Sequence, residues 1–399
     1  MSNYEQNSML TDVPFDALLI ISYGGPEGPE EVQPFLENVL HGRNVSQQQF
    51  DAAATKYHAI GGASPVNEEC RSLISGLLRD IDANRYSGQT TLWPQDAVTE
   101  PRINEVFAQV MQLPIYWGNL FWHPLLEDTI AGMAEEGIRR VIAFCTVPFG
   151  TEHSTRSYGG AIDEAVKKIN IPDFVVQQTR LFYNHPLFIS TMADRLAETL
   201  QGREIRDERR EARDEKTDEI PPLSMPSTPL TLHPSPLAPG LSPLTPHPSP
   251  LVLFTAHSVP ATDAEFESYQ SQMKQACSLV ADLVQLDRFG IDWDIAWQSR
   301  GGSRGSWCEP DVVDYVKMLL KGERFPGKKT VISCPIGFML ENMELLYDLD
   351  VELRQFCESV GLNYARTLPV SGHPKSIAMI RELVAEVYSP LVPRRHLGG

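Results

Sequence analysis

The 399-residue sequence has no long hydrophobic run and little positive charge. No apolar stretch approaches the roughly 20 residues that a membrane-spanning helix requires. Lysine and arginine number 34 against 52 aspartates and glutamates, which gives a formal net charge of −18. This acidic balance argues against nucleic-acid binding, which needs a basic surface. The N-terminal MSNYEQNSMLTDVPF has no apolar core of the kind found in signal peptides. We therefore expect a cytoplasmic protein without a membrane span.

Paired cysteines and the common nucleotide motifs are also missing. The six cysteines include no CxxC spacing, which is typical of free thiols in a reducing compartment. The YGGP stretch lacks the GxGxxG spacing of a dinucleotide site, and the chain has no Walker A sequence. It also has no GxSxG elbow of the kind that serine hydrolases carry. These absences argue against a disulfide framework, a permanent zinc site, a nucleotide cofactor and a serine hydrolase.

What the chain does contain is a regular alternation of short apolar runs and longer amphipathic segments. Buried parallel strands have this continuous apolar, β-branched character. Four such runs fall in each half, which predicts an α/β fold of two similar domains, each with a parallel four-stranded sheet, and a cleft between them. No clear sequence repeat relates the halves. The predicted strands span 16–22, 113–118, 140–147, 173–179, 251–258, 293–299, 330–338 and 362–368, and helical patterns between them include 123–137 and 185–200.

The predicted organisation is an N-terminal domain at 14–180, a C-terminal domain at 181–375 and a C-terminal helix and tail at 376–399. An insert at 203–250 interrupts the second domain. From Arg203 to Glu219, 14 of 17 residues are charged, and 11 of the chain's 31 prolines lie between Pro221 and Pro250. Such a composition cannot bury a core, so we expect the insert to be disordered.

Candidate chemical groups lie where the predicted strands end, because ligands bind beyond the carboxyl ends of strands in open α/β sheets. Tyr23 follows the first strand, and His257 ends the fifth. An imidazole there could transfer a proton, bind a metal or be a satisfied core histidine. After the seventh strand, Glu344, Asp348 and Glu352 recur at i, i+4 and i+8 on one predicted helix face. Because like charges at this spacing destabilise a helix, this acidic ladder (Glu344, Asp348 and Glu352) favours proton removal or transient cation binding.

Five motifs in this order resemble the ferrochelatase family. They are ISYGGPEGPEEVQPFLENV, YHAIGGASPVN, FTAHSVP, WQSRGGSRGSWCEPDV and PIGFMLENMELLYDLDVE. The resemblance covers nearly the whole chain outside 201–250. It implies two Rossmann-like, chelatase-type domains that hold a porphyrin in the cleft between them. It also implies a lyase of haem biosynthesis that inserts Fe²⁺ into that porphyrin.

The resemblance also implies roles for individual residues. His257 takes protons from the pyrrole nitrogens and Glu344 faces the same pocket, so both meet the incoming Fe²⁺. Asp348 and Glu352 continue a polar path for protons or metal, and Tyr23 lies near the metal on the opposite porphyrin face. Because the unperturbed pKa of histidine is about 6.5, we expect a neutral imidazole to accept the first proton.

Substrate choice follows from the same resemblance. Tyr23 in YGGP favours coproporphyrin III over protoporphyrin IX, and Arg43, Ser64, Ser299 and Arg300 are candidate donors to the porphyrin carboxylates. The C-terminal tail has no cysteines, so we expect no [2Fe–2S] cluster. We expect a monomer whose ligands are its substrates, Fe²⁺ and porphyrin. The alternatives are a protoporphyrin IX ferrochelatase, a cobalt or nickel tetrapyrrole chelatase, and a non-catalytic tetrapyrrole carrier.

Overall fold

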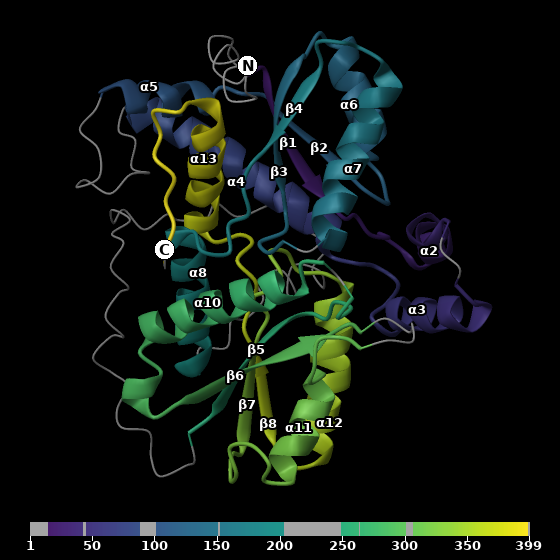
Figure 1. Cartoon of the computed structure of the whole chain (residues 1–399), viewed down its shortest axis with the longest axis vertical. Helices are drawn as coiled ribbons and strands as arrows, with labels where there is room; N and C mark the ends of the chain where they lie inside the picture. The colour runs from purple at the N-terminus through teal and green to yellow at the C-terminus, as the bar shows by residue number, and fades with distance from the viewer. Residues whose placement is uncertain are drawn as a thin grey trace, which may run out of the picture.

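The computed structural model describes residues 15–42, 45–87, 101–150, 152–202, 249–262, 264–300 and 306–397. These residues form two parallel four-stranded sheets with the orders β2-β1-β3-β4 and β6-β5-β7-β8. Figure 1 shows the first sheet above the second. The identical strand order in the two halves confirms two similar α/β domains.

The first sheet is built around β1. Its strands are β1 (Ala17–Ser22), β2 (Ile115–Asn119), β3 (Arg140–Cys145) and β4 (Val175–Gln178). All six residues of β1 are buried, and β1 pairs in parallel with both β2 and β3. A central strand that is covered on both faces needs apolar residues at every position, which is why ALLIIS shows no alternation.

The second sheet repeats this plan around β5. Its strands are β5 (Leu251–His257), β6 (Asp292–Gln298), β7 (Thr330–Cys334) and β8 (Asn363–Arg366). The first six residues of β5 are buried and only His257 at its carboxyl end is partly exposed. All eight predicted strands are therefore confirmed, with ends that differ by a few residues.

Helices cover both sheets. One face of each sheet joins a shared apolar core with α4, α5, α8, α10 and α13. The opposite face of the first sheet packs on α6 and α7, and that of the second packs on α11, α12 and a π-helix. The helices are α2 (Val32–Leu40), α3 (Gln47–Ala59), α4 (Val66–Ser87), α5 (Pro101–Val110), α6 (Leu126–Glu135), α7 (Glu152–Ile169), α8 (Pro186–Leu200), α10 (Phe266–Val284), α11 (Val312–Leu320), the π-helix η4 (Leu345–Leu353), α12 (Arg354–Ser359) and α13 (Pro374–Tyr388). Short 3₁₀ turns lie at η2 (Pro29–Glu31) and η3 (Asp287–Phe289).

A His-Pro pair begins the helix that follows the fourth strand of each sheet. His185 precedes α8 and His373 precedes α13, and each imidazole accepts a hydrogen bond from the backbone N–H two residues later. This local repeat marks the duplication, although it is too short to stand out in the sequence. Helix α13 contacts α8 and also α5 of the first domain, so these helices join the two halves.

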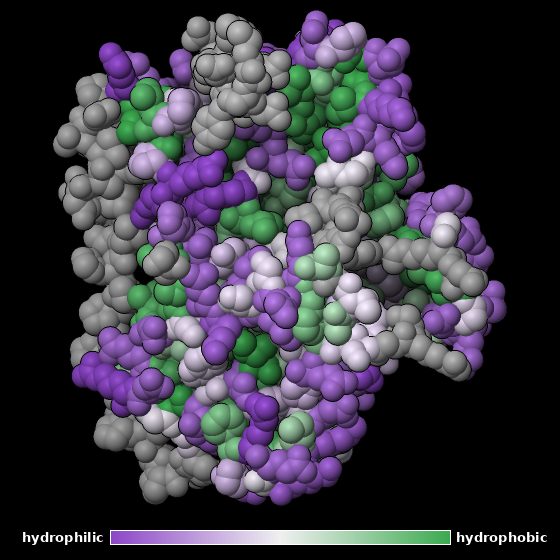
Figure 2. Space-filling model, viewed as in Figure 1, coloured by the Kyte–Doolittle hydropathy of each residue, from purple (hydrophilic) through white to green (hydrophobic). Residues whose placement is uncertain are grey.

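The visible surface is largely hydrophilic. Hydrophilic side chains cover most of the face seen in Figure 2, with apolar groups between them. Within the described ranges, no helix is both long and apolar enough to cross a membrane. Almost all of the predicted insert, residues 203–248, lies outside the described residues. The predicted domain boundaries stay a prediction.

Candidate active site

His257 makes two polar contacts at the carboxyl end of β5. Its Nδ1 lies 2.6 Å from the carbonyl oxygen of Ser258, so this nitrogen carries a proton and donates it. Its Nε2 lies 3.4 Å from Oε1 of Glu344. The hydroxyl of Tyr269 donates to the His257 carbonyl at 2.9 Å, which holds the strand end in place. The contacts therefore direct Nε2 towards the acidic ladder.

His257 and Glu344 form a partly buried ion pair. Burial opposes the imidazolium charge, but the Glu344 carboxylate, the Ser258 carbonyl and Asp348 raise the pKa of His257 to about 9. Burial also opposes the charge on Glu344, yet His257 and Lys56 bring its pKa below the ordinary value. The side chains of His257 and Glu344 are 44% and 30% exposed. The resting imidazole therefore carries a proton at neutral pH, which differs from the expected neutral base.

Asp348 is the buried centre of the acidic ladder. Its Oδ1 lies 2.8 Å from Lys56 Nζ, and its Oδ2 accepts from the Ser299 hydroxyl at 2.5 Å. Glu352 is exposed beyond it, and burial together with repulsion by Asp348 raises the pKa of Glu352. The ladder thus runs from Glu344 beside the histidine, through the buried Asp348 carboxylate that Lys56 balances in charge, to the exposed Glu352.

Asp348 and Glu352 of the ladder lie on a π-helix, where a regular helix was predicted, and Glu344 is the residue directly before it. Leu345–Leu353 has the wider i→i+5 turn, a form that is rare and frequent at functional sites. Arg366 of β8 anchors this π-helix. Its guanidinium donates two hydrogen bonds to Asp350, of 2.9 and 2.6 Å, and lies 2.9 Å from the Glu341 carboxylate. The sequence does not reveal Arg366, because a single arginine at a strand end has no distinguishing pattern.

Ser299 adopts a left-handed backbone conformation directly after β6. Its φ is 61°, which is uncommon for a residue with a side chain. This turn aims its hydroxyl at Asp348, so in this state the hydroxyl is engaged by the ladder. Ser299 therefore stabilises the buried carboxylate, whatever further contact it makes with a ligand.

Tyr23 of the first domain presents an aromatic ring at the carboxyl end of β1. It is exposed, and its ring lies 4.7 Å from that of Phe121 and 6.4 Å from that of Phe35. Burial raises the pKa of the nearby Tyr57, and the charges of Tyr23 and Glu344 raise it further. Tyr57 therefore lies close enough to interact electrostatically with Tyr23 of the first domain and Glu344 of the second.

The loop after Tyr23 needs its two glycines. Gly24 has a φ of 81°, and a Cβ there would lie 2.8 Å from Asn119 Cβ. A Cβ on Gly25 would lie 2.7 Å from Ser64 Cβ. Ser64 also donates its backbone N–H to Pro26 at 2.8 Å. Ser64 is buried against this loop, so the YGGP and YHAIGGASPVN motifs meet in space.

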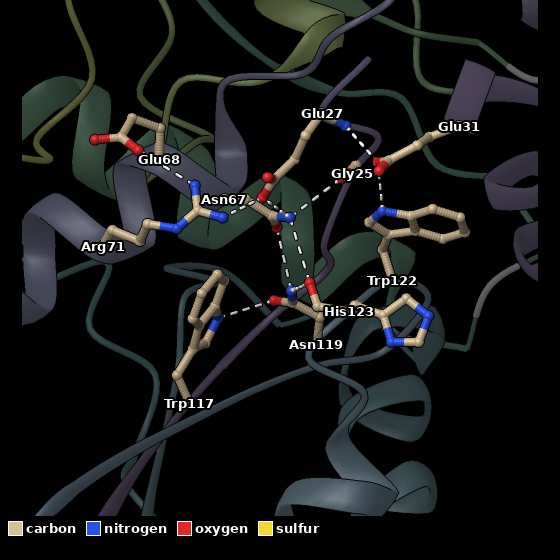
Figure 3. A network of polar contacts seen from close by, with 10 residues as sticks. All are labelled: Gly25, Glu27, Glu31, Asn67, Glu68, Arg71, Trp117, Asn119, Trp122 and His123. Atoms are coloured by element: carbon tan, nitrogen blue, oxygen red, sulfur yellow. Dashed lines mark hydrogen bonds and ion pairs between the residues drawn. The ribbon is translucent and has the colours of Figure 1, made fainter. Parts of the chain in front are cut away.

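A polar network beneath this loop fixes its position (Figure 3). Buried Asn67 donates to Gly25 at 3.2 Å and to the Glu27 carboxylate at 2.8 Å. Asn119 of β2 donates to Asn67 at 3.1 Å, and the indole of Trp117 donates to Asn119 at 2.9 Å. This network ties the carboxyl ends of β1 and β2 to α4, so Tyr23 stands on a rigid base.

The remaining candidates have separate positions. Arg43 lies outside the described residues, and Arg300 is exposed after β6. Lys56 was missed, because a lysine on an amphipathic helix normally indicates a solvated face. No group of three or more His, Cys, Asp or Glu side chains in the described part of the chain could hold a metal ion.

The chain is similar to known proteins over nearly its whole length. The family model Ferrochelatase matches residues 15–213 and 240–388, which leaves the middle of the insert unmatched. The chain is 33% identical over 386 residues to the Ferrochelatase of Rhodopirellula baltica, which covers 96% of this chain and 90% of that protein. It is 30% identical over 384 residues to the Coproporphyrin III ferrochelatase of Corynebacterium glutamicum, with 93% and 84% covered. The enzyme of the same name from Mycobacterium ulcerans is 32% identical over 391 residues, with 96% and 90% covered.

A more distant likeness exists among solved structures. SirB from Bacillus subtilis with Fe³⁺ aligns with a TM-score of 0.45 at 10% identity. The alignment covers 96% of this chain and 100% of that chain.

Proposed function

The chain belongs to the ferrochelatase family, and on that basis we propose that it inserts Fe²⁺ into coproporphyrin III between its two domains. The observation that carries this proposal is the His257–Glu344 pair, 3.4 Å apart at the end of β5. Glu344 begins the acidic ladder, which continues to the surface through Asp348 and Glu352. The coproporphyrin relatives at 30–32% identity support the choice of substrate.

The reaction removes two N–H protons from the macrocycle and replaces them with one Fe²⁺, without any change in oxidation state. In the resting pair His257 is protonated and cannot accept a proton. An approaching Fe²⁺ repels the imidazolium and lowers the pKa of His257, because a nearby like charge disfavours the charged form. Its proton is released to the solvent that reaches the half-exposed imidazole, and the neutral imidazole then becomes the base for a pyrrole N–H. Arrival of the metal thus creates the base.

The ladder gives the protons an exit. Glu344 delivers a proton towards Asp348, and the exposed Glu352 exchanges it with water. The raised pKa of Glu352 suits a carboxyl that must hold a proton briefly near the surface. We therefore propose a relay that carries protons out of the site and the metal into it, formed by His257, Glu344, Asp348 and Glu352.

The first domain contributes the opposite wall of the site. We place the Tyr23 hydroxyl against the porphyrin face opposite His257, near the metal. Arg43, Ser64 and Ser299 are the donors that we propose for the porphyrin carboxylates, and a guanidinium suits a carboxylate because it binds with two parallel hydrogen bonds. Ser299 would have to leave Asp348 or share its hydroxyl to do so.

We propose that the protein works in the cytoplasm as a monomer without an iron–sulfur cluster. The last cysteine of the chain is the buried Cys357, so the C-terminal segment offers no cluster ligands. Size-exclusion chromatography with light scattering and the visible spectrum of anaerobically purified protein test these points. A dimer mass or absorbance of a [2Fe–2S] centre would contradict them.

The first test is anaerobic Fe²⁺ insertion with coproporphyrin III and protoporphyrin IX in parallel. We expect turnover of coproporphyrin III, and a loss of at least about 100-fold in kcat for His257→Ala, because general-base groups contribute about 10²–10⁴-fold. Faster turnover of protoporphyrin IX would keep the enzyme class and overturn the substrate. Tight porphyrin binding without insertion of any metal would identify a carrier instead.

A further inference from the structure

Lys56 crosses from the first domain to the acidic ladder of the second. It lies on α3, and its Nζ is 2.8 Å from Asp348 Oδ1 and 5.0 Å from the centre of the Tyr347 ring. Figure 1 shows α3 at the side of the molecule, level with the junction of the two sheets. Lys56 and Asp348 are 292 positions apart in sequence, so only the packing of the two domains creates this pair.

The Lys56 ammonium is a counter-ion for the whole ladder. It pairs directly with Asp348, and its charge interacts favourably with both Glu344 and Glu352. Asp348 is buried, at 4% exposure, and a buried carboxylate needs a positive partner. Lys56 supplies that charge at the centre of the three acids.

The same ammonium is partly exposed and sits at the end of a flexible side chain. Its side chain is 37% exposed, and a lysine carries its charge on a flexible four-carbon stem. Other hydrogen bonds also join the two domains: Gln272 accepts from the Gly150 backbone, and Ser371 donates to the buried Glu69. Neither contact involves Lys56 or Asp348.

We propose that Lys56 is a displaceable counter-ion, which occupies the cation position of the ladder and yields it to Fe²⁺ in transit. An ammonium and a divalent ion compete for the same carboxylate oxygens. Lys56 therefore keeps the affinity of the empty ladder for divalent ions low, so that Fe²⁺ moves on to the porphyrin. This inference rests on the proposed function of the same site.

The direct test is a titration of the porphyrin-free protein with Mn²⁺, a cation that favours carboxylate ligands. The electron paramagnetic resonance signal of free Mn²⁺ measures how much of the ion is bound. We expect Lys56→Met to bind Mn²⁺ about tenfold or more tightly than wild type, since it removes a repelling charge beside the carboxylates. Lys56→Arg, which keeps the charge, should stay close to wild type. Lys321→Met is the matched control, because it removes one charge from an exposed lysine paired with Glu323.

A second variant locates the effect. In Lys56→Met combined with Asp348→Asn, the gain in Mn²⁺ affinity should disappear. Equal Mn²⁺ affinity in wild type and Lys56→Met would overturn the proposal, as would a gain that survives the loss of Asp348. Thermal unfolding of each variant confirms that the compared proteins are folded.

Insertion kinetics add an independent readout. With coproporphyrin III, Lys56→Met should lower both the KM for Fe²⁺ and kcat, because a ladder that retains the ion releases it slowly. A raised KM with unchanged kcat would contradict the counter-ion role. If no variant inserts iron, the proposed function fails, while the Mn²⁺ titration still decides the role of Lys56.

Discussion

At the scale of single residues, the charge on His257 results from opposing effects. Burial alone would lower its pKa, whereas Glu344 at 3.4 Å and the Ser258 carbonyl at 2.6 Å raise it to about 9. The sequence shows a histidine at a strand end but not the carboxylate 87 positions later that faces it. The resting protonation state is therefore a property of the assembled pair.

We predict that the His257 ring titrates near pH 9 in the porphyrin-free protein. Glu344→Gln should lower this pKa by about 1–3 units, because an adjacent opposite charge is removed. Nuclear magnetic resonance of the histidine ring carbons, with His257→Ala for assignment, measures both values. A wild-type pKa at or below 6.5 would contradict the ion pair.

The same shift sets a pH window for stability. The folded pKa of His257 lies above its unfolded value of about 6.5, so the contribution of the pair is complete below pH 6.5 and disappears as the pH rises through about 9. The pKa of Glu344 is lowered on folding, so its part of the contribution is present above its ordinary value of 4.5. The pair therefore stabilises the fold most between about pH 4.5 and pH 6.5.

At the scale of elements, the π-helix depends on a clamp behind it. Arg366 is 8% exposed and binds both Glu341, which precedes the π-helix, and Asp350, which lies within it. Burial raises the pKa of Glu341, and the Arg366 guanidinium counteracts this. The clamp sets the position of the ladder on the opposite face.

We predict that Arg366→Met lowers the free energy of unfolding by about 3 kcal/mol at pH 8, because removing one member of a buried ion pair leaves an uncompensated charge. The pKa of Glu341 should rise further, so the folded variant binds an extra proton and the loss should shrink at pH 5. Urea unfolding at the two pH values measures this.

The matched control for this clamp is Arg354→Met. Arg354 is 39% exposed and lies 3.5 Å from the same Asp350, so its loss should cost at most about 1 kcal/mol. Equal effects of the two substitutions would show that Arg366 does not act as a buried clamp.

At the scale of the whole molecule, the two domains share one apolar core. Residues from β1, β3, β5 and β7 join α8, α10 and α13 in this cluster. Helix α13, the last in the chain, contacts α5 of the first domain and α8 of the second. The halves therefore support each other on one side, while Lys56 and Asp348 meet on another.

We predict that deletion of residues 214–239 leaves the melting temperature unchanged and the rate of iron insertion within about twofold of wild type. The family match skips these residues, and their composition cannot bury a core. Differential scanning calorimetry and the insertion assay measure the two effects. Loss of insertion in a folded deletion variant would assign the insert a role in catalysis.

Local sequence patterns determined much of the fold. The eight strands were predictable because a strand in a covered parallel sheet must be apolar along its whole length. The strand-end positions of Tyr23 and His257 followed from the rule that ligands bind at the carboxyl ends of parallel strands.

The sequence by itself therefore determined the architecture, the strand ends that form the site and the spacing of the acidic ladder. Only the tertiary structure decided which charges the ladder meets: the imidazolium of His257, the ammonium of Lys56 and the hydroxyl of Ser299. It also decided that Asp348 and Glu352 lie on a π-helix held by Arg366. The physical reason is range, because strand patterns reflect burial that acts at every residue, whereas these charge pairs form between residues far apart in the chain and exist only after the domains pack.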